Sequence, residues 1–287
     1  IMMLIADGGS TKSNWCLVKG DGLPNDYFNT EGYNPYFADT QSIIKSLESS
    51  LPGELNKYQI KHIYYYGAGC STPEKNRIVE IAMQNVFKNA KVFVGHDLLA
   101  SARALLGNTT GFAAILGTGT NTCLYNGKNI TLNIDSLGYF LGDEGSGSYI
   151  GRKLLRDYMR RFLPAELHKT FLDTFGLSNE DILDALYNKP LPNRFLASFA
   201  KFVNDNRHLD YCSNIVHEGF TSFFENLVSK YPEYRSYSFN CVGSVGFNFA
   251  DILSSVAEKY GMSTGKIIRS PIDDLVQFHL DFPELLD

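Results

Sequence analysis

The chain contains two matching hairpins, in each of which a glycine-rich turn joins two short apolar runs. The first turn, residues 7–13 (D-G-G-S-T-K-S), lies between the apolar runs 2–6 and 15–18, and the second, residues 117–121 (G-T-G-T-N), lies between 112–116 and 122–125. Because glycine lets the backbone approach a ligand without a Cβ, such turns can present several N–H groups to one anion. Two of them at matching places predict a cleft that binds a polyphosphate from both sides.

Each half of the chain begins with strands and continues with alternating helices and strands. Aromatic and β-branched residues mark the strands, and apolar residues spaced by three and four mark the helices. In the first half we expect strands at 2–6, 15–18, 26–30, 62–66 and 91–94, and helices at 40–51, 73–87 and 98–106. In the second half we expect strands at 112–116, 122–125, 129–134, 238–242 and 266–269, and helices at 249–260 and from 271. This order predicts the α/β class, with mixed sheets that carry packed helices.

A turn-rich stretch at 107–111 separates the two halves. We therefore predict one domain at 1–107 and a second at 108–270, with the last helix, about 271–287, packing back on the first. The second domain holds a mostly helical insertion at about 148–230, in which 190–193 (P-L-P-N) is expected to form a loop.

Composition excludes several classes of protein. The 287 residues carry a net charge of −5, which argues against non-specific nucleic-acid binding because that needs a basic surface. The five scattered cysteines contain no C-x-x-C pair, so they are expected to be reduced thiols of a cytoplasmic protein. No apolar run approaches the roughly 20 residues that span a bilayer, so no membrane partner is expected.

Asp7 ends the first apolar run and begins the first glycine turn. A carboxylate beside bound phosphates would repel them unless a cation lay between, so we expect Asp7 to hold Mg²⁺ directly or through water. The alternative is that Asp7 merely favours a tight turn. Backbone groups of Gly8, Gly9, Ser10 and Thr11 are expected to bind phosphate, with Lys12 as a point charge or a solvated side chain.

Asp97 lies between an expected strand and an expected helix. In open α/β sheets ligands bind at the carboxyl ends of strands, so Asp97 is a candidate general base. The alternative is that Asp97 only caps the helix. His96 is a competing base, although a single histidine at a strand end is more often structural.

Three further segments carry polar groups suited to a sugar or a nucleoside. Asp143, in the run G-D-E-G-S-G at 142–147, can accept hydrogen bonds from a polyol, and Asn34, in the aromatic-flanked turn 32–36, offers both a donor and an acceptor. The turn at 242–246 (V-G-S-V-G) follows a strand and precedes a helix, so its backbone can approach a base or a ribose. The chain lacks a P-loop, a complete G-x-G-x-x-G after a strand, H-E-x-x-H and G-x-S-x-G.

Taken together, these motifs resemble those of the actin-like ATPase superfamily of sugar kinases, hexokinases, actin and heat-shock chaperones. More narrowly, the sequence resembles N-acetylglucosamine kinases within the BadF/BadG/BcrA/BcrD-type ATPase family, over nearly the whole chain. The most specific sign is G-T-G-x-N at 117–121 followed by G-D-E-G-S at 142–146. Iron–sulfur activators of the same broad family need cysteines placed to hold a cluster, and the cysteines here do not fit that pattern.

The resemblance implies two actin-like (ribonuclease H-like) lobes with an interlobe cleft and an ATP-dependent, Mg²⁺-dependent kinase that phosphorylates the 6-hydroxyl of an amino sugar, most simply N-acetylglucosamine. It implies that Asp97 is the catalytic base and that the sugar is bound by Asn34, Asn121 and Asp143. The nucleotide would be bound by the first turn and by Gly117, Thr118, Gly119, Thr120, Gly243, Ser244 and Gly246. The alternative is a nucleotide-gated regulator or activator without sugar kinase activity. A homodimer is compatible with the sequence.

Overall fold

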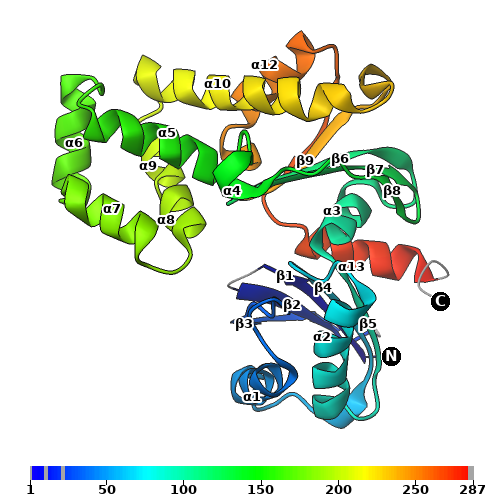
Figure 1. The fold of residues 1–287 in the computed structure, drawn as a ribbon. Coiled ribbons are helices and arrows are strands. Elements are labelled where there is room, and N and C mark those ends of the chain that lie inside the picture. The colour runs from blue at the N-terminus through cyan, green and yellow to red at the C-terminus, as the bar shows by residue number, and fades with distance from the viewer. Residues whose placement is uncertain (1, 10–11, 21–22, 284–287) are drawn as a thin grey trace. The chain divides into compact units, whose positions relative to one another are not determined.

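A computed structural model describes residues 2–9, 12–20 and 23–283 of the chain. The chain forms two compact units, each with its own sheet and its own hydrophobic core (Figure 1). Unit 1 comprises Ile1–Thr109, Gly127–Asn129 and Pro271–Asp287, and unit 2 comprises Thr110–Asn126 and Ile130–Ser270.

The sheet of unit 1 has five strands in the order β3-β2-β1-β4-β5. These are β1 (Met2–Gly8), β2 (Lys12–Val18), β3 (Asp26–Glu31), β4 (Ile60–Gly67) and β5 (Lys91–His96). β1, β2 and β3 are antiparallel neighbours, whereas β4 and β5 run parallel to β1. The first hairpin is tighter than expected, because Asp7 still pairs with Asn14 across β1 and β2. Asp7 is therefore a strand residue, and its interpretation as a turn residue is wrong.

Helices cover both faces of this sheet (Figure 1). On one face, α1 (Thr40–Ser50) and α2 (Pro73–Val86) pack against each other and share a core with the inward residues of β1 and β2. On the other face, α3 (Asp97–Leu106) and α13 (Ile272–Asp281) pack together, and α13 also contacts β1 and β2. A short 3₁₀ turn, η1 (Lys57–Gln59), precedes β4. The sheet is thus enclosed on both faces, which leaves its edges and strand ends for ligands.

A buried arginine joins α3 and α13 to the sheet. Arg103 is 5% exposed, and its guanidinium donates to Tyr66 Oη and lies against the rings of Phe93 and Phe278. Tyr66 Oη is also 3.0 Å from His279 Nε2. Burial, reinforced by the positive charge of Arg103, lowers the pKa of His279 to about 3. His279 is therefore neutral in the folded protein.

This neutral histidine predicts a loss of stability in acid. Between pH 6.5 and 3 the unfolded chain protonates His279 and the folded chain does not, so the free energy of unfolding falls as the pH drops below about 6.5. His279→Gln cannot titrate. From pH 8 to pH 5, wild type should therefore lose roughly 1–2 kcal/mol relative to this variant in denaturant titrations. A difference between the two proteins that stays constant with pH would contradict the prediction.

The sheet of unit 2 has the same mixed arrangement, in the order β10-β9-β6-β7-β8. The strands are β6 (Thr110–Leu116), β7 (Thr120–Asn126), β8 (Ile130–Leu132), β9 (Phe239–Val242) and β10 (Thr264–Ile268). β7 pairs antiparallel with β6 and β8, and β9 pairs parallel with both β6 and β10. β8 is shorter than the strand expected at 129–134. Two mixed sheets of matching topology confirm the predicted α/β class with two lobes.

Between β8 and β9 the chain is mostly helical. The helices there are α4 (Gly138–Leu141), α5 (Gly147–Met159), α6 (Ala165–Phe175), α7 (Asn179–Tyr187), α8 (Pro192–Ser198), α9 (Ala200–Asp205) and α10 (Asp210–Asn226), followed by the 3₁₀ turns η2 (Val228–Lys230) and η3 (Tyr234–Ser236). The loop expected at 190–193 is wrong in its second half, because Pro192 begins α8, where a first-turn proline loses no hydrogen bond.

Two helices connect β9 to β10, the last strand of unit 2. α11 (Ser244–Asn248) follows β9 directly, and α12 (Ala250–Lys259) packs against α10 and β10. The core of this unit joins the inward face of β6 to α5, α10 and α12. In the described part of the chain, every helix is too short or too polar to cross a membrane.

Candidate functional site

In unit 1, the carboxyl ends of three parallel strands bring two aspartates to one edge of the sheet. Asp7 of β1 lies in register with Tyr66 of β4, which lies in register with Gly95 of β5. Asp97 comes directly after the last residue of β5 and is the first residue of α3. Such an edge is where parallel α/β sheets place ligands, since the strand ends and helix N-termini meet there.

The charge of Asp97 acts on the carboxyl group of Asp7. Burial and the negative charge of Asp97 together raise the pKa of Asp7 to about 7, against a smaller opposing effect of a hydrogen bond from Asn14. Ionisation of Asp7 beside the first glycine turn is therefore unfavourable while no cation is bound. A bound cation would relieve this repulsion.

Asp97 has a carboxylate oxygen without a donor. Its Oδ1 is buried and accepts no hydrogen bond among the described residues. His96 Nδ1 is 3.1 Å from this oxygen, but the same nitrogen accepts the N–H of Leu98 and so carries no proton to donate in the neutral ring. His96, and not Asp97, is the N-cap of α3, so the capping interpretation of Asp97 is wrong. A carboxylate oxygen without a donor can accept a proton from a substrate hydroxyl.

The same residues are suited to Mg²⁺. Residues 2–9, 12–20 and 23–283 hold no cluster of three or more His, Cys, Asp or Glu side chains arranged to bind a metal. A closed, all-protein metal cage is thus absent from the described chain. Mg²⁺ is commonly held by one or two carboxylates together with water and substrate phosphates, and the excess charge at Asp7 and Asp97 fits that mode.

A buried tyrosine, Tyr65, packs against the start of the first glycine turn. A Cβ at Gly8 would lie 2.3 Å from Tyr65 Oη, so only glycine fits there. Gly9 is exposed and its N–H donates to Lys12 O at 2.9 Å, which closes the turn, and the side chain of Lys12 is exposed. Ser10 and Thr11 lie outside the described residues.

The turn that carries Asn34 lies beside the end of β4. Asn34 Oδ1 accepts the N–H of Tyr36 at 3.0 Å, and a Cβ on Gly69 would lie 2.3 Å from that same oxygen. Burial, and then the charge of Asp97, raises the pKa of the neighbouring Cys70 to about 12. Asn34 and Asp97 are therefore at the same edge of unit 1.

In unit 2, the second glycine turn is braced by the segment that begins with Asp143. The buried Asp143 carboxylate accepts the N–H of Thr120 at 3.1 Å, and a Cβ on Gly119 would lie 3.0 Å from its other oxygen. The Thr120 hydroxyl donates to Glu144 O, and the first N–H groups of α5 donate to Gly117 O and Thr118 O. Burial raises the pKa of Asp143. Asp143 thus orients the turn, whatever else it binds.

Asn121 lies at the start of β7, next to this turn. Its Oδ1 accepts hydrogen bonds from the N–H of Thr122 at 3.0 Å and from Asn133 Nδ2 at 2.9 Å. The amide oxygen is therefore already oriented by the protein, which leaves the amide NH₂ as the group that this geometry offers to a ligand.

The turn after β9 lies directly against the turn after β6. Gly243 has φ +131°, and a Cβ there would lie 2.3 Å from Leu116 O, so the position requires glycine. Gly246 packs on Cys241 and Leu116 beneath the surface. Ser244 is exposed and lines a cavity of about 500 Å³ with Gly117 and Thr118. Both turns therefore border one cavity within unit 2.

Helices of the insertion complete that cavity. Its other walls come from α8, α9, α11, the residue between α11 and α12, and the residue after β10: Ala197, Ser198, Ala200, Lys201, Asn204, Asp205, Val245, Asn248, Phe249 and Arg269. Lys201 pairs with Asp205, and Arg269 donates to Asn248 Oδ1 at 2.6 Å. A cavity of this size and mixed polarity is in the range that holds a nucleoside.

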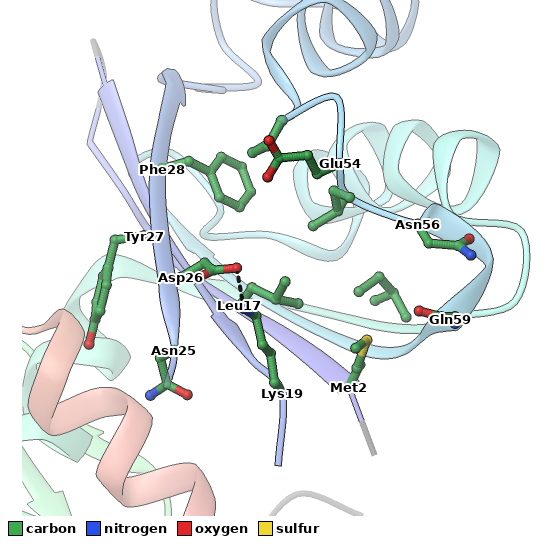
Figure 2. Close-up of a pocket in the computed structure, with 13 residues that line it drawn as sticks. Met2, Leu17, Lys19, Asn25, Asp26, Tyr27, Phe28, Glu54, Asn56 and Gln59 are labelled. Atoms are coloured by element: carbon green, nitrogen blue, oxygen red, sulfur yellow. Dashed lines mark ion pairs between the residues drawn. The ribbon is translucent and has the colours of Figure 1, made fainter. Parts of the chain in front are cut away.

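A second cavity, of about 510 Å³, lies at the opposite end of the unit 1 strands (Figure 2). Met2 at the start of β1 and Ile60 at the start of β4 line it, whereas Asp7 and Asp97 lie at the carboxyl ends. An ion pair between Lys19 and Asp26, 2.7 Å apart, crosses its wall. None of the residues predicted for the site lines this cavity, so we place the candidate site at the carboxyl edge.

Sequence reasoning missed three contributors. Asn14 faces Asp7 across the first hairpin, and its place opposite an aspartate in a two-stranded pairing was a usable signal. Tyr65 supports Gly8 from a strand that follows about 50 residues later, and the α8–α9 wall of the unit 2 cavity comes from the insertion. No local pattern marks either of these.

Comparisons with known proteins show what the chain as a whole is similar to. No family model matches the chain. The crystal structure of the proposed N-acetylglucosamine kinase of Porphyromonas gingivalis is 37% identical, covers 98% of this chain and 99% of its own, and superimposes with a TM-score of 0.93. A glucokinase of the ROK family from Streptomyces griseus, solved with glucose and AMPPNP, is 14% identical over 97% of this chain and 98% of its own, with a TM-score of 0.55, and shares the fold.

Among curated proteins, the chain is similar to the N-acetylmuramic acid/N-acetylglucosamine kinase of Clostridium acetobutylicum. The identity is 27% over 142 residues, which is 48% of this chain and 46% of the relative. The aligned segment thus spans about half the length of that protein.

Proposed function

Because the chain belongs to the family of N-acetylglucosamine kinase-like proteins within the actin-like ATPase and sugar kinase superfamily, we propose that it transfers the terminal phosphoryl group of ATP to the 6-hydroxyl of an N-acetylated hexosamine. N-Acetylglucosamine is the first candidate, since the proteins of P. gingivalis and C. acetobutylicum are both named for it. The observation that carries the proposal is the donor-free oxygen of Asp97 beside the carboxylate of Asp7.

In unit 1, Asp97 accepts the proton of the sugar hydroxyl as the oxygen attacks phosphorus. Asn34, from the same edge, binds the sugar through its amide. Asp7 holds Mg²⁺, which when bound neutralises charge on the phosphates. The first glycine turn, with Gly8, Ser10, Thr11 and Lys12, binds phosphate oxygens, and the N–H of Gly9 closes that turn by donating to Lys12 O.

In unit 2, the braced turn of Gly117, Thr118, Gly119 and Thr120 also binds phosphate. The cavity lined by Ser244 takes the adenosine, and Gly243 and Gly246 keep that turn close to the end of β6. Asn121 and Asp143, at the same turn, bind further sugar hydroxyls. In phosphoryl transfer most of the rate acceleration comes from such positioning and from charge stabilisation.

The proposal is tested by sugar-dependent ADP release. The panel is N-acetylglucosamine, N-acetylmannosamine, N-acetylmuramic acid, glucosamine and glucose, each with ATP and Mg²⁺. We expect release to depend on an N-acetylated sugar and to be slow without sugar, since a closed site excludes water. ATP hydrolysis that ignores every sugar would overturn the proposal and favour a nucleotide-gated regulator.

Filling the unit 2 cavity should weaken ATP binding selectively. Ser244 is exposed at the first turn of α11, so Ser244→Phe is expected to fold normally and to place its ring in the cavity. We expect the KM for ATP to rise by roughly tenfold or more, with the KM for sugar within about twofold. Ser255→Phe, on an exposed face of α12, is the matched control and should behave as wild type. An unchanged KM for ATP in Ser244→Phe would remove the adenosine assignment.

A further inference from the structure

One buried hydroxyl connects three segments of unit 1 that carry candidate ligand groups. Tyr65, on β4, has no exposed surface. Its Oη is 3.2 Å from Ser13 Oγ, on the strand that leaves the first glycine turn, and it accepts the N–H of Tyr33 at 3.2 Å. Tyr33 directly precedes Asn34. A single phenol oxygen is therefore hydrogen-bonded both to the first glycine turn, residues 7–13 (the phosphate turn), and to the turn at 32–36 that carries Asn34 (the Asn34 turn).

The ring of Tyr65 fixes the backbone on two sides as well. A Cβ on Gly8 would lie 2.3 Å from Oη, and a Cβ on Gly67 would lie 2.5 Å from Cε1. The rings of Trp15 and Tyr33 lie 5.7 Å and 6.1 Å from it, centroid to centroid. These neighbours hold the ring in place, so its hydroxyl cannot move away from either hydrogen bond.

The hydroxyl is also kept in its protonated form. Burial raises the pKa of Tyr65 far above its ordinary value of 10. Protonated, Oη can accept from the Tyr33 N–H while it shares a hydrogen with Ser13 Oγ, which satisfies all three groups. Removing the oxygen would leave a buried backbone N–H and a buried serine without this partner, which is unfavourable.

We propose that Tyr65 is a positioning residue that sets the phosphate turn at Gly8 and Gly9 and the Asn34 turn in register with each other. Its hydroxyl touches neither substrate. It acts through the Tyr33 N–H on one side and Ser13 on the other, so one group controls the binding of both ligands. The proposal rests on the proposed function for the identity of those ligands.

The test is Tyr65→Phe, which keeps the ring and removes only the oxygen. We expect the KM for the sugar and the Kd for MgADP each to rise about tenfold, with kcat within about threefold of wild type, because the turns shift while Asp97 stays in place. Ser13→Ala should weaken MgADP binding alone. In the double variant, MgADP binding should be no weaker than in Tyr65→Phe, since both changes break one contact.

Tyr158→Phe is the matched control. Tyr158 is a buried tyrosine of unit 2 whose hydroxyl donates to Leu177 O at 3.1 Å. Its loss should lower Tm to a similar extent and leave both affinities unchanged. If Tyr65→Phe lowers Tm but keeps both affinities within twofold, its role is structural only and the proposal is wrong. Failure of the proposed function would appear differently, as a wild-type protein that phosphorylates no sugar.

Discussion

Asp97→Asn is expected to lower kcat by about 10²–10⁴, the usual size of a general-base loss, while the Kd for MgADP changes by less than about threefold. The asparagine keeps the shape of the side chain but cannot take the proton of the sugar hydroxyl. Because Asp97 Oδ1 accepts no hydrogen bond among the described residues, the substitution removes no hydrogen bond to this oxygen. Steady-state kinetics and nucleotide titration on the same preparation measure both quantities.

Asp39→Asn is the matched control for this change. Asp39 caps α1 by accepting the N–H of Ser42 at 2.8 Å, and asparagine caps helices about as well as aspartate. Turnover of this variant should equal that of wild type. Near-wild-type turnover in Asp97→Asn would reject Asp97 as the base, and a large loss of MgADP binding would move its role from proton transfer to nucleotide binding.

Asp7→Asn should abolish the benefit of Mg²⁺ and at the same time stabilise the free protein. In wild type, Mg²⁺ should tighten ADP binding at least tenfold, because the cation offsets the repulsion between phosphates and the Asp7 carboxylate. In the variant, ADP should bind about equally with Mg²⁺ and with EDTA, and kcat/KM should fall by at least about 10². Calorimetric titration of ADP under the two conditions measures the effect.

The same substitution should change stability in the opposite direction to activity. Desolvation and the negative charge of Asp97 both disfavour the charged form of Asp7, so removing its charge should raise Tm by a few degrees at pH 8 in EDTA. Such opposed effects are typical of residues retained for activity at a cost in stability. An Mg²⁺ response identical to that of wild type would show that another group holds the cation.

Much of the fold follows from local patterns. Periodicity and turn residues predicted the strands of both sheets and most of the long helices, because alternating burial and amphipathic spacing are written into short windows of sequence. The predicted element boundaries were wrong where a short stretch of sequence suits both a turn and a regular element. Asp7 and Gly8 continue β1 since pairing with β2 outweighs the turn preference of Asp-Gly, and Pro192 begins α8 since a proline suits a first helical turn as well as a loop.

The candidate site was less accessible from sequence. Asp97 could be singled out because a strand end followed by a helix start is a local signal. Its donor-free oxygen could not, since that depends on His96 Nδ1 being engaged by the Leu98 N–H. Tyr65 and the α8–α9 wall contact residues that are far from them in the sequence, and local periodicity does not predict such contacts. The roles assigned to Asp7, Asp97 and the glycine turns remain predictions for the experiments above.

Product identification by ³¹P and ¹³C NMR tests the central claim most directly. Wild-type protein is incubated with ATP, Mg²⁺ and N-acetylglucosamine, and the phosphorus product is assigned. The account predicts a sugar monophosphate coupled to carbon 6, formed in equal amount to ADP and missing from the Asp97→Asn reaction. Inorganic phosphate and ADP without a sugar phosphate would contradict it.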